Sequence, residues 1–255
     1  MPMIELKNLT KRYGRTLAVD RLRLSVPKGI IFGFIGPNGA GKTTTIKMMG
    51  GLMAPDSGTV KINGIDMAQF PEKAKQIIGF IPDRPYLYEK LTGMEFLKFT
   101  ADLYDVAPKR FSDAALSMLD RFSLLDWRNE LIEAYSHGMK QRLIMAAAIL
   151  HEPKVIIVDE PMVGLDPAGI RMVKALFQNL AANGVSFFIS THTLSIAQEL
   201  CDRIGIIHKG QLIATGTLDD LKIQANASED DLEAVFLKIT QEERMGLDNQ
   251  PVAGN

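Results

Sequence analysis

A run of nine residues, 36–44, has the residue types and spacing of a phosphate-binding loop. It fits the pattern G-x-x-x-x-G-K-[ST] and follows an apolar segment, 30–35, that is typical of a buried strand. Glycines let backbone N–H groups converge on phosphate oxygens, and the following helix presents its positive end to them. The lysine can reach the β- and γ-phosphates, and the first threonine can ligate Mg²⁺. The loop consists of Gly36, Pro37, Asn38, Gly39, Ala40, Gly41, Lys42, Thr43 and Thr44.

Two carboxylates follow a second apolar run, residues 155–158. Asp159 ends this expected strand, where a carboxylate suits Mg²⁺ directly or through water. Glu160 is then placed to take a proton from an attacking water. The alternative is a strand that simply ends in a solvated acidic pair, which the phosphate-binding loop in the same chain disfavours. Together the two motifs predict a site for ATP and Mg²⁺.

Alternating strands and helices surround these motifs and predict an α/β fold. Alternation of apolar and polar residues predicts a strand at 18–26, and the Asn63-Gly64 pair predicts a hairpin within 60–66. Asp166-Pro167 reads as a helix cap followed by proline at the first helical position. We expect further strands at 77–82, 155–158 and 187–190, a hairpin across 204–214, and helices from Lys42 and from 166 to 184.

A helical block interrupts the strand-rich parts. Thr92 and Glu95 can form a capping box for a helix through Tyr104, and further helices are expected near 112–122 and from Ser136 to a point before Pro153. The tail carries one amphipathic helix, at about 230–239, and turns polar after Gln241. We expect an N-terminal antiparallel β part with the phosphate loop, an inserted helical subdomain, the rest of the core, and a tail. The corresponding ranges are 1–83, 84–150, 151–218 and 219–255.

Composition narrows the function classes. The 255 residues are 46% hydrophobic and carry a net charge of −1. This charge gives no basic field of the kind that attracts nucleic acid, so nucleic acid is not expected as a partner. A single cysteine excludes an intrachain disulfide and fits a reducing compartment. The N-terminus lacks the shape of a signal peptide, and the apolar stretches are too short to span a bilayer.

With these motifs in this order, the chain resembles the ATP-binding subunit of an ABC transporter over nearly its whole length. Residues 36–44 match the Walker A loop, 156–160 match Walker B, and 164–166 match the D-loop. The resemblance implies a P-loop NTPase (RecA-like) core in which Lys42, Glu160 and His192 are catalytic. His192, just past a strand, would be the switch histidine at the γ-phosphate, and Tyr13 would stack on adenine.

Two positions depart from the family pattern. The signature, usually Leu-Ser-Gly-Gly-Gln, reads Tyr-Ser-His-Gly-Met at 135–139, so that Ser136 and Gly138 remain but His137 replaces a glycine. A helix N-terminus with a serine hydroxyl still suits phosphate. The glutamine that usually follows the strand into the helical lobe is replaced by Asp83, which can still bind Mg²⁺ or water. The alternatives are a plain helix cap for Ser136 and a simple turn residue for Asp83.

The resemblance also implies how the protein works. Two chains, identical or paralogous, would close head to tail around two ATP molecules, with Ser136 and Gly138 contributed by the opposing chain. The dimer would drive an integral membrane permease from the cytoplasmic face of the membrane. The tail at 231–238 is similar to that of ATPases paired with multidrug- or antibiotic-exporting permeases, which favours export.

Two rival functions are left open by the sequence. One is a soluble ABC-type ATPase that acts on the ribosome or on nucleic acid. The other is a regulatory module in which Asp83 and His137 have abolished turnover. Tyr86 and Tyr88 likewise have two interpretations, because they can contact the membrane partner or pack within the helical lobe.

Overall fold

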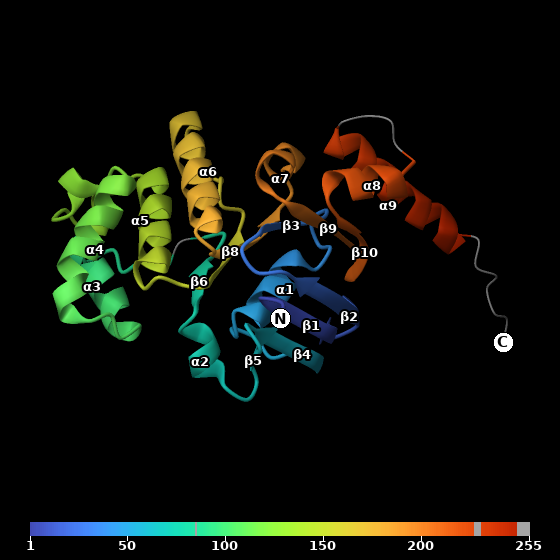
Figure 1. Ribbon diagram of the computed structural model, residues 1–255, viewed down its shortest axis with the longest axis horizontal. Coiled ribbons are helices and arrows are strands. Elements are labelled where there is room, and N and C mark those ends of the chain that lie inside the picture. The colour runs from blue at the N-terminus through green and yellow to red at the C-terminus, as the bar shows by residue number, and fades with distance from the viewer. Residues whose placement is uncertain (85, 227–230, 249–255) are drawn as a thin grey trace.

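The computed structural model describes residues 1–84, 86–226 and 231–248 (Figure 1). It confirms the predicted α/β class, with one antiparallel sheet and one mostly parallel sheet. The antiparallel sheet contains β1 (Ile4–Tyr13), β2 (Thr16–Val26), β4 (Ser57–Ile62) and β5 (Ile65–Asp66), in the order β2-β1-β4-β5. The larger sheet contains β3 (Ile31–Ile35), β6 (Ile78–Ile81), β7 (Val155–Asp159), β8 (Ser186–Thr191), β9 (Arg203–His208) and β10 (Gln211–Gly216), in the order β10-β9-β3-β8-β7-β6.

Parallel pairing in the larger sheet brings the candidate functional loops together. Strand β8 pairs with β3 on one side and β7 on the other, with Ile35 opposite Thr191 and Asp159 opposite Ser190. The loops that follow β3, β7 and β8 therefore leave the sheet side by side at its carboxyl edge, where ligands bind in open α/β sheets. All positions of these three strands are buried, as strands covered on both faces require.

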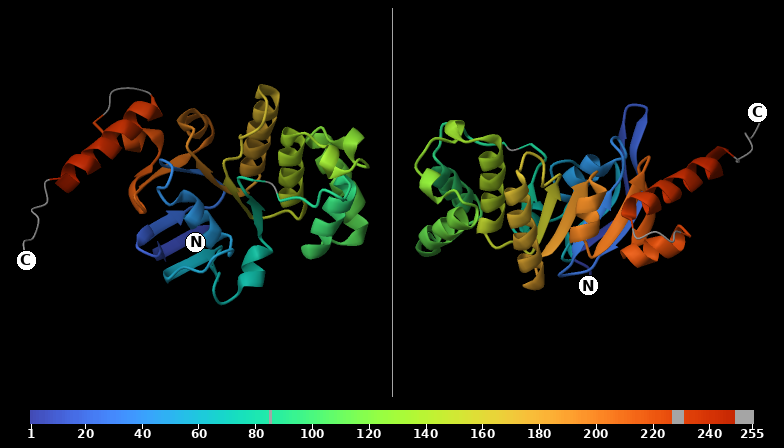
Figure 2. Two further views of the ribbon diagram at one scale, coloured as in Figure 1. Left: turned by 180° about the vertical axis from the view of Figure 1, so that it is seen from behind. Right: turned by 90° about the horizontal axis from the view of Figure 1, so that it is seen from above.

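Helices cover both faces of this sheet (Figures 1 and 2). Adjacent residues of a strand point to opposite faces, so Phe188 joins a buried cluster with β1 and α1 while Phe187 joins another with α5 and α6. A third cluster holds the last helices against β9. The helices are α1 (Lys42–Met49), α2 (Pro71–Lys75), α3 (Gly93–Leu103), α4 (Pro108–Arg121), α5 (His137–Leu150), α6 (Pro167–Ala182), α7 (Leu194–Leu200), α8 (Leu218–Gln224) and α9 (Leu232–Asp248).

The inserted helices α3, α4 and α5 gather at one end of the molecule, and α8 and α9 lie at the other end (Figure 2). Their starts follow the local signals in the sequence. Thr92 and Glu95 form the predicted capping box of α3. Ser136 caps α5, accepting the Met139 N–H at 3.3 Å, and Asp166 caps α6, accepting the Gly169 N–H at 2.8 Å. Short side-chain caps thus fix where the helices beside the site begin.

Several elements differ from the sequence-based expectation. Strand β1 was not predicted, because register shifts after Leu6 and a left-handed Asn8 break its alternation. Helix α4 starts at Pro108, four residues earlier than expected, with proline at its first position. The short helices α2 and α8 were missed. Helix α9 continues to Asp248, past the expected end near 239, and the predicted start at 230 lies outside the described residues.

The domain division and the absence of membrane-spanning segments are the two larger expectations from the sequence. The division of the chain at 83, 150 and 218 stays a prediction, since one buried cluster spans the inserted helices and the larger sheet. Within the ranges that the structure describes, no helix combines enough length and apolar character to cross a membrane.

Candidate functional site

The loop between β3 and α1 forms a cradle whose shape depends on glycine at two positions and favours it at a third. A Cβ on Gly36 would lie 2.3 Å from the Ile207 carbonyl oxygen, and one on Gly41 would lie 2.4 Å from that of Ala18. Gly39 has a left-handed φ of 79°, and the space beside it is open within 4 Å. Backbone N–H groups in such a concave loop bind anions.

Lys42 lies at the bottom of this cradle with 7% of its surface exposed. Its Nζ donates hydrogen bonds to the carbonyl oxygens of Gly36, at 2.6 Å, and Pro37, at 3.2 Å. Burial lowers the pKa of Lys42, while the carboxylates of Glu160 and Asp159 oppose this shift. Because its hydrogen-bond partners are neutral carbonyls, the ammonium can exchange them for an anionic ligand, so the pocket favours an anion.

Asp159 supplies the opposite charge at the end of β7. One of its carboxylate oxygens accepts the Thr43 hydroxyl at 2.9 Å. Burial raises the pKa of Asp159, and the neighbouring carboxylates of Glu160 and Asp83 raise it further, while the hydrogen bond from Thr43 opposes the shift. A cation at these oxygens would relieve that repulsion.

The oxygen atoms of Thr43, Asp159 and Asp83 suit Mg²⁺, but they do not form a complete site. Among the residues described, no group of three His, Cys, Asp or Glu side chains is arranged to hold a metal ion. Mg²⁺ commonly takes one or two protein carboxylates and completes its shell with phosphates and waters. The donor set therefore fits Mg²⁺ that arrives with a triphosphate.

Glu160 and His192 meet beside this charged pair. The Glu160 carboxylate accepts hydrogen bonds from the Thr191 hydroxyl at 3.0 Å, the His192 backbone N–H at 2.9 Å and the His192 Nδ1 at 2.6 Å. An ionised carboxylate only accepts, so Nδ1 carries the proton and Nε2 is left for another partner. Glu160 has a left-handed φ of 51°, an uncommon backbone state that often marks functional sites.

A cavity of about 410 Å³ joins these groups into one site. Its lining contains most of the residues predicted from the sequence, and Val163 in addition. The lining residues are Asn38, Gly39, Gly41, Lys42, Thr43, Thr44, Asp83, Asp159, Glu160, Val163 and His192. The cavity places an anion-binding cradle, carboxylates for a cation and a carboxylate base within one space.

Six predicted residues do not line this cavity: three belong to the phosphate loop itself (Gly36, Pro37 and Ala40), and three come from other segments (Tyr13, Ser136 and Gly138). Tyr13 lies at the end of β1 with 47% of its surface exposed, and its hydroxyl donates to the Met53 sulfur at 3.0 Å. Ser136 and Gly138 begin α5 on the helical part of the chain, where the Ser136 side chain is exposed. None of these last three lines the space around Lys42 and Glu160.

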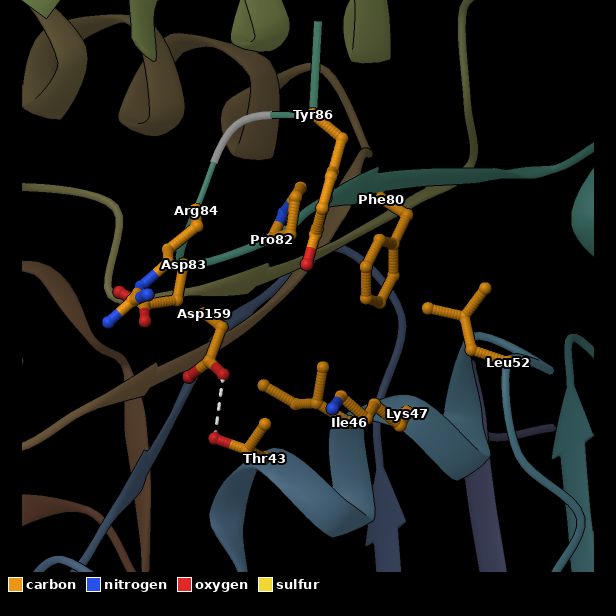
Figure 3. A pocket seen from close by; sticks show the side chains of 10 residues that line it. All are labelled: Thr43, Ile46, Lys47, Leu52, Phe80, Pro82, Asp83, Arg84, Tyr86 and Asp159. Atoms are coloured by element: carbon orange, nitrogen blue, oxygen red, sulfur yellow. Dashed lines mark hydrogen bonds between the residues drawn. The ribbon is translucent and has the colours of Figure 1, made fainter. Parts of the chain in front are cut away.

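A second hollow of about 350 Å³ adjoins the first and shares Thr43, Asp83 and Asp159 with it (Figure 3). Its apolar walls come from Ile46 and Leu52 on the α1 side and from Phe80 and Tyr86 on the β6 side. Tyr86 is 83% exposed, and Tyr88 is 61% exposed and rests edge-on against Phe99. Both tyrosines keep most of their surface exposed, and the Tyr88 ring also packs on α3 through Phe99.

Sequence reasoning missed two residues of the site. Thr191 holds the Glu160 carboxylate, and its position directly before His192 at a strand end could have indicated this role. Val163 lines the cavity between Glu160 and the D-loop, and nothing in its residue type distinguishes it.

Comparison with known proteins gives matches over most of the chain. Residues 19–163 match the family model described as ABC transporter. The protein named Probable multidrug ABC transporter ATP-binding protein YbhF of Escherichia coli is 38% identical over 240 residues. That match covers 93% of this chain, which spans only 41% of YbhF. The bacitracin transport ATP-binding protein BcrA of Enterococcus faecalis is 41% identical over 220 residues, which cover 86% of this chain and 70% of BcrA.

Solved structures show the same fold. An ATP-binding subunit of an ABC transporter superposes with a TM-score of 0.89 at 34% identity, covering 93% of this chain and 99% of that structure. A dimeric ATP-binding cassette in a post-hydrolysis state, bound to ADP and Pi, gives a TM-score of 0.77 at 25% identity, covering 84% of this chain and 98% of that structure.

Proposed function

This chain belongs to the ABC transporter family, and we propose from that premise that it powers export of a substrate through a separate membrane permease. As a member of this family it is an ATP-binding cassette with ATPase activity. The observation that carries the proposal is the hydrogen bond between His192 and Glu160, in the cavity that also contains the buried Lys42. The cavity thus contains both a carboxylate base fixed by hydrogen bonds, Glu160, and a positively charged group that can bind an anion, Lys42.

In this proposal, the loop from Gly36 to Thr44 holds the triphosphate, and Lys42 exchanges its carbonyl partners for phosphate oxygens. Thr43, Asp159 and Asp83 provide oxygen ligands for Mg²⁺. The ion would supply charge neutralisation between the β- and γ-phosphates. The exposed ring of Tyr13 stacks on adenine.

Glu160 orients the attacking water and accepts its proton. The Thr191 hydroxyl and the His192 backbone hold the carboxylate in place for this step. His192 donates its Nδ1–H to Glu160, which leaves Nε2 facing the γ-phosphate, and with both ring nitrogens protonated Nε2–H would donate to a phosphate oxygen. Because the transition state of phosphoryl transfer is loose, placement and charge stabilisation supply most of the acceleration.

The site becomes complete when a second copy, identical or paralogous, lies across it. Ser136 and Gly138 then approach the γ-phosphate from the opposing subunit, with the positive end of α5 and the serine hydroxyl directed at it. The dimeric relative bound to ADP and Pi supports this arrangement. A signature contributed by a second copy would account for the absence of Ser136 and Gly138 from the cavity of a single chain.

The permease docks on two exposed rings, that of Tyr86, which lines the second hollow (Figure 3), and that of Tyr88. Movement of these rings would follow from changes at Asp83, which borders both cavities. The protein would then be peripheral on the cytoplasmic face of the membrane. The names of BcrA and YbhF, a bacitracin transport protein and a multidrug transporter subunit, support export over import.

The test is Glu160→Gln, because glutamine keeps the size of the side chain but cannot take a proton. We expect ATP binding to persist, hydrolysis to fall by on the order of 10²-fold or more, and ATP-bound dimers to accumulate. Size-exclusion chromatography with ATP and a phosphate-release assay measure both effects. Glu152→Gln, at an exposed glutamate that pairs with Arg110, is the matched control. Normal turnover in Glu160→Gln would remove this residue from its proposed role.

A further inference from the structure

We propose that His137 is a positioning residue that couples the two ATP sites of the dimer. It does so by linking the start of α5, which acts at the opposing subunit's ATP, to the catalytic loop of its own chain. The inference rests on the proposed head-to-tail dimer. His137 is the residue at which the signature departs from the usual glycine, so the link is a feature of this sequence.

The contact is direct and lies within one chain. The His137 imidazole fills the space beside Gly164, where a Cβ would come within 2.2 Å of the ring Cδ2 and 2.5 Å of Nε2. Gly164 has a left-handed φ of 80°, which a residue with a side chain rarely adopts. The next residue of α5 touches the same point, since a Cβ on Gly138 would lie 3.1 Å from the Gly164 carbonyl oxygen. Helix α5 therefore packs directly on the D-loop, through the contact of the His137 imidazole with the backbone of Gly164.

From Gly164 the connection to the catalytic carboxylate is short and hydrogen-bonded. The Leu165 N–H donates to the Met162 carbonyl, and the Val163 N–H donates to the Glu160 carbonyl, each at 3.3 Å. These overlapping turns join Gly164 to Glu160 over four residues. Glu160 is itself fixed, because its own N–H donates to the Ser190 carbonyl at 2.9 Å. A shift of Gly164 therefore acts on the backbone that aims the base.

The two ends of this connection serve different nucleotides. Ser136 and Gly138 meet the ATP held by the opposing subunit, whereas Glu160 serves the ATP in its own cavity. When α5 closes on one ATP, the His137 ring moves with it and presses on Gly164. Close-packed contacts transmit such displacements rather than absorbing them. The state of one site thereby biases the geometry of the base in the other.

The experiment compares His137→Gly, which restores the usual family residue and empties the space, with His137→Gln, which refills much of it. ATP hydrolysis by the full-length protein is measured against ATP concentration. For wild type we expect a Hill coefficient between about 1.5 and 2, which falls to about 1 in His137→Gly. In that variant kcat falls on the order of 10-fold, through misplacement of the base, while ATP binding at low protein concentration is unchanged. His137→Gln recovers most of the cooperativity.

Lys140→Gly is the matched control, because it puts the same residue into the same helix without touching Gly164, and it keeps the wild-type Hill coefficient. Thermal melting verifies that all variants fold. Wild-type cooperativity in His137→Gly, or a non-cooperative wild type, would overturn the inference. Failure of Glu160→Gln to accumulate ATP-bound dimers would instead overturn the proposed dimer, so the two failures are distinguishable.

Discussion

The phosphate cavity and the signature surface differ in how far a single chain completes them. In the cavity, Lys42, Asp159 and Glu160 are held by hydrogen bonds within the chain, and Lys42 and Asp159 are almost fully buried. At the signature, Ser136 and His137 are exposed, and the hydrogen bond that the Ser136 side chain accepts only caps its own helix. The phosphate cavity is therefore preorganised, whereas the signature surface presents its serine to a ligand outside its own chain.

The difference shows that binding and turnover are separable in this molecule. A preorganised cradle can bind nucleotide in a single chain, because its donors need little rearrangement. The signature can contribute only after a second copy arrives. We therefore expect substitutions in the phosphate cavity to weaken nucleotide binding, and substitutions at the signature to slow hydrolysis without changing nucleotide binding.

The largest effect is expected from Lys42→Ala in the preorganised region. It removes the buried cation that faces the phosphates, so nucleotide affinity should fall on the order of 10²-fold, the result of losing a charge-assisted contact of about 3 kcal/mol. Titration of dilute protein with a fluorescent ATP analogue measures it. Unchanged affinity would refute the assignment of the phosphate loop.

Next comes Gly138→Asp, which places a carboxylate where the opposing triphosphate should lie. Like charges at close range are strongly unfavourable, so hydrolysis should fall by on the order of 10-fold or more. Binding of the fluorescent analogue to dilute protein should not change. Loss of that binding would mean that the two regions form one site within a single chain. Binding and turnover would then not be separable.

Asp83→Gln sharpens the comparison at the border of the cavity. The variant replaces an exposed carboxylate with a neutral amide oxygen, which is a weaker ligand, so the Mg²⁺ concentration for half-maximal activity should rise about 2- to 5-fold. The Asp83 carboxylate also raises the pKa of Asp159. Its removal lowers that pKa, so Asp159 stays ionised to lower pH and the acidic limb of the pH–rate profile moves to lower pH. An acidic limb that did not move would show that the Asp83 carboxylate does not influence the ionisation of Asp159.

The last prediction concerns stability rather than turnover, at the place where His151 packs between the inserted helices and the larger sheet. His151 stacks on Tyr104 of α3 and contacts the Ile78 carbonyl of β6 through Nε2, at 3.1 Å. Burial lowers the pKa of His151 from 6.5 to about 4. The unfolded chain therefore takes up a proton first as the pH falls from 6.5 towards 4, and stability is lost over that interval. At pH 5 the loss is about 2 kcal/mol.

His151→Gln should lack this part of the pH dependence, because glutamine does not titrate. Denaturant unfolding at pH 7.5 and pH 5 measures the difference for both proteins. Equal losses of unfolding free energy in wild type and variant would show that His151 does not protonate on unfolding.

The sequence predicted the parts of the site that depend on local chemistry. The loop 36–44, the acidic end of β7 and the caps Thr92, Ser136 and Asp166 all follow from neighbouring residues. Contacts between distant segments could not be predicted in this way. The hold of Thr191 on Glu160 and the contact of His137 with Gly164 depend on strand order and helix packing. Strand β1 was hidden for a local reason, because its bulges break the alternation that identifies a strand.

The central claim is that each active site is shared between two chains. Its most direct test mixes Lys42→Ala protein with Gly138→Asp protein, each of which is impaired in ATP hydrolysis when it is alone. A mixed dimer would hold one intact site, with the phosphate cavity of the Gly138→Asp chain facing the signature of the Lys42→Ala chain. We therefore expect ATP hydrolysis by the mixture to rise well above the sum of the two proteins measured separately. Activity equal to that sum, under conditions where native mass spectrometry shows mixed dimers, would contradict the shared site.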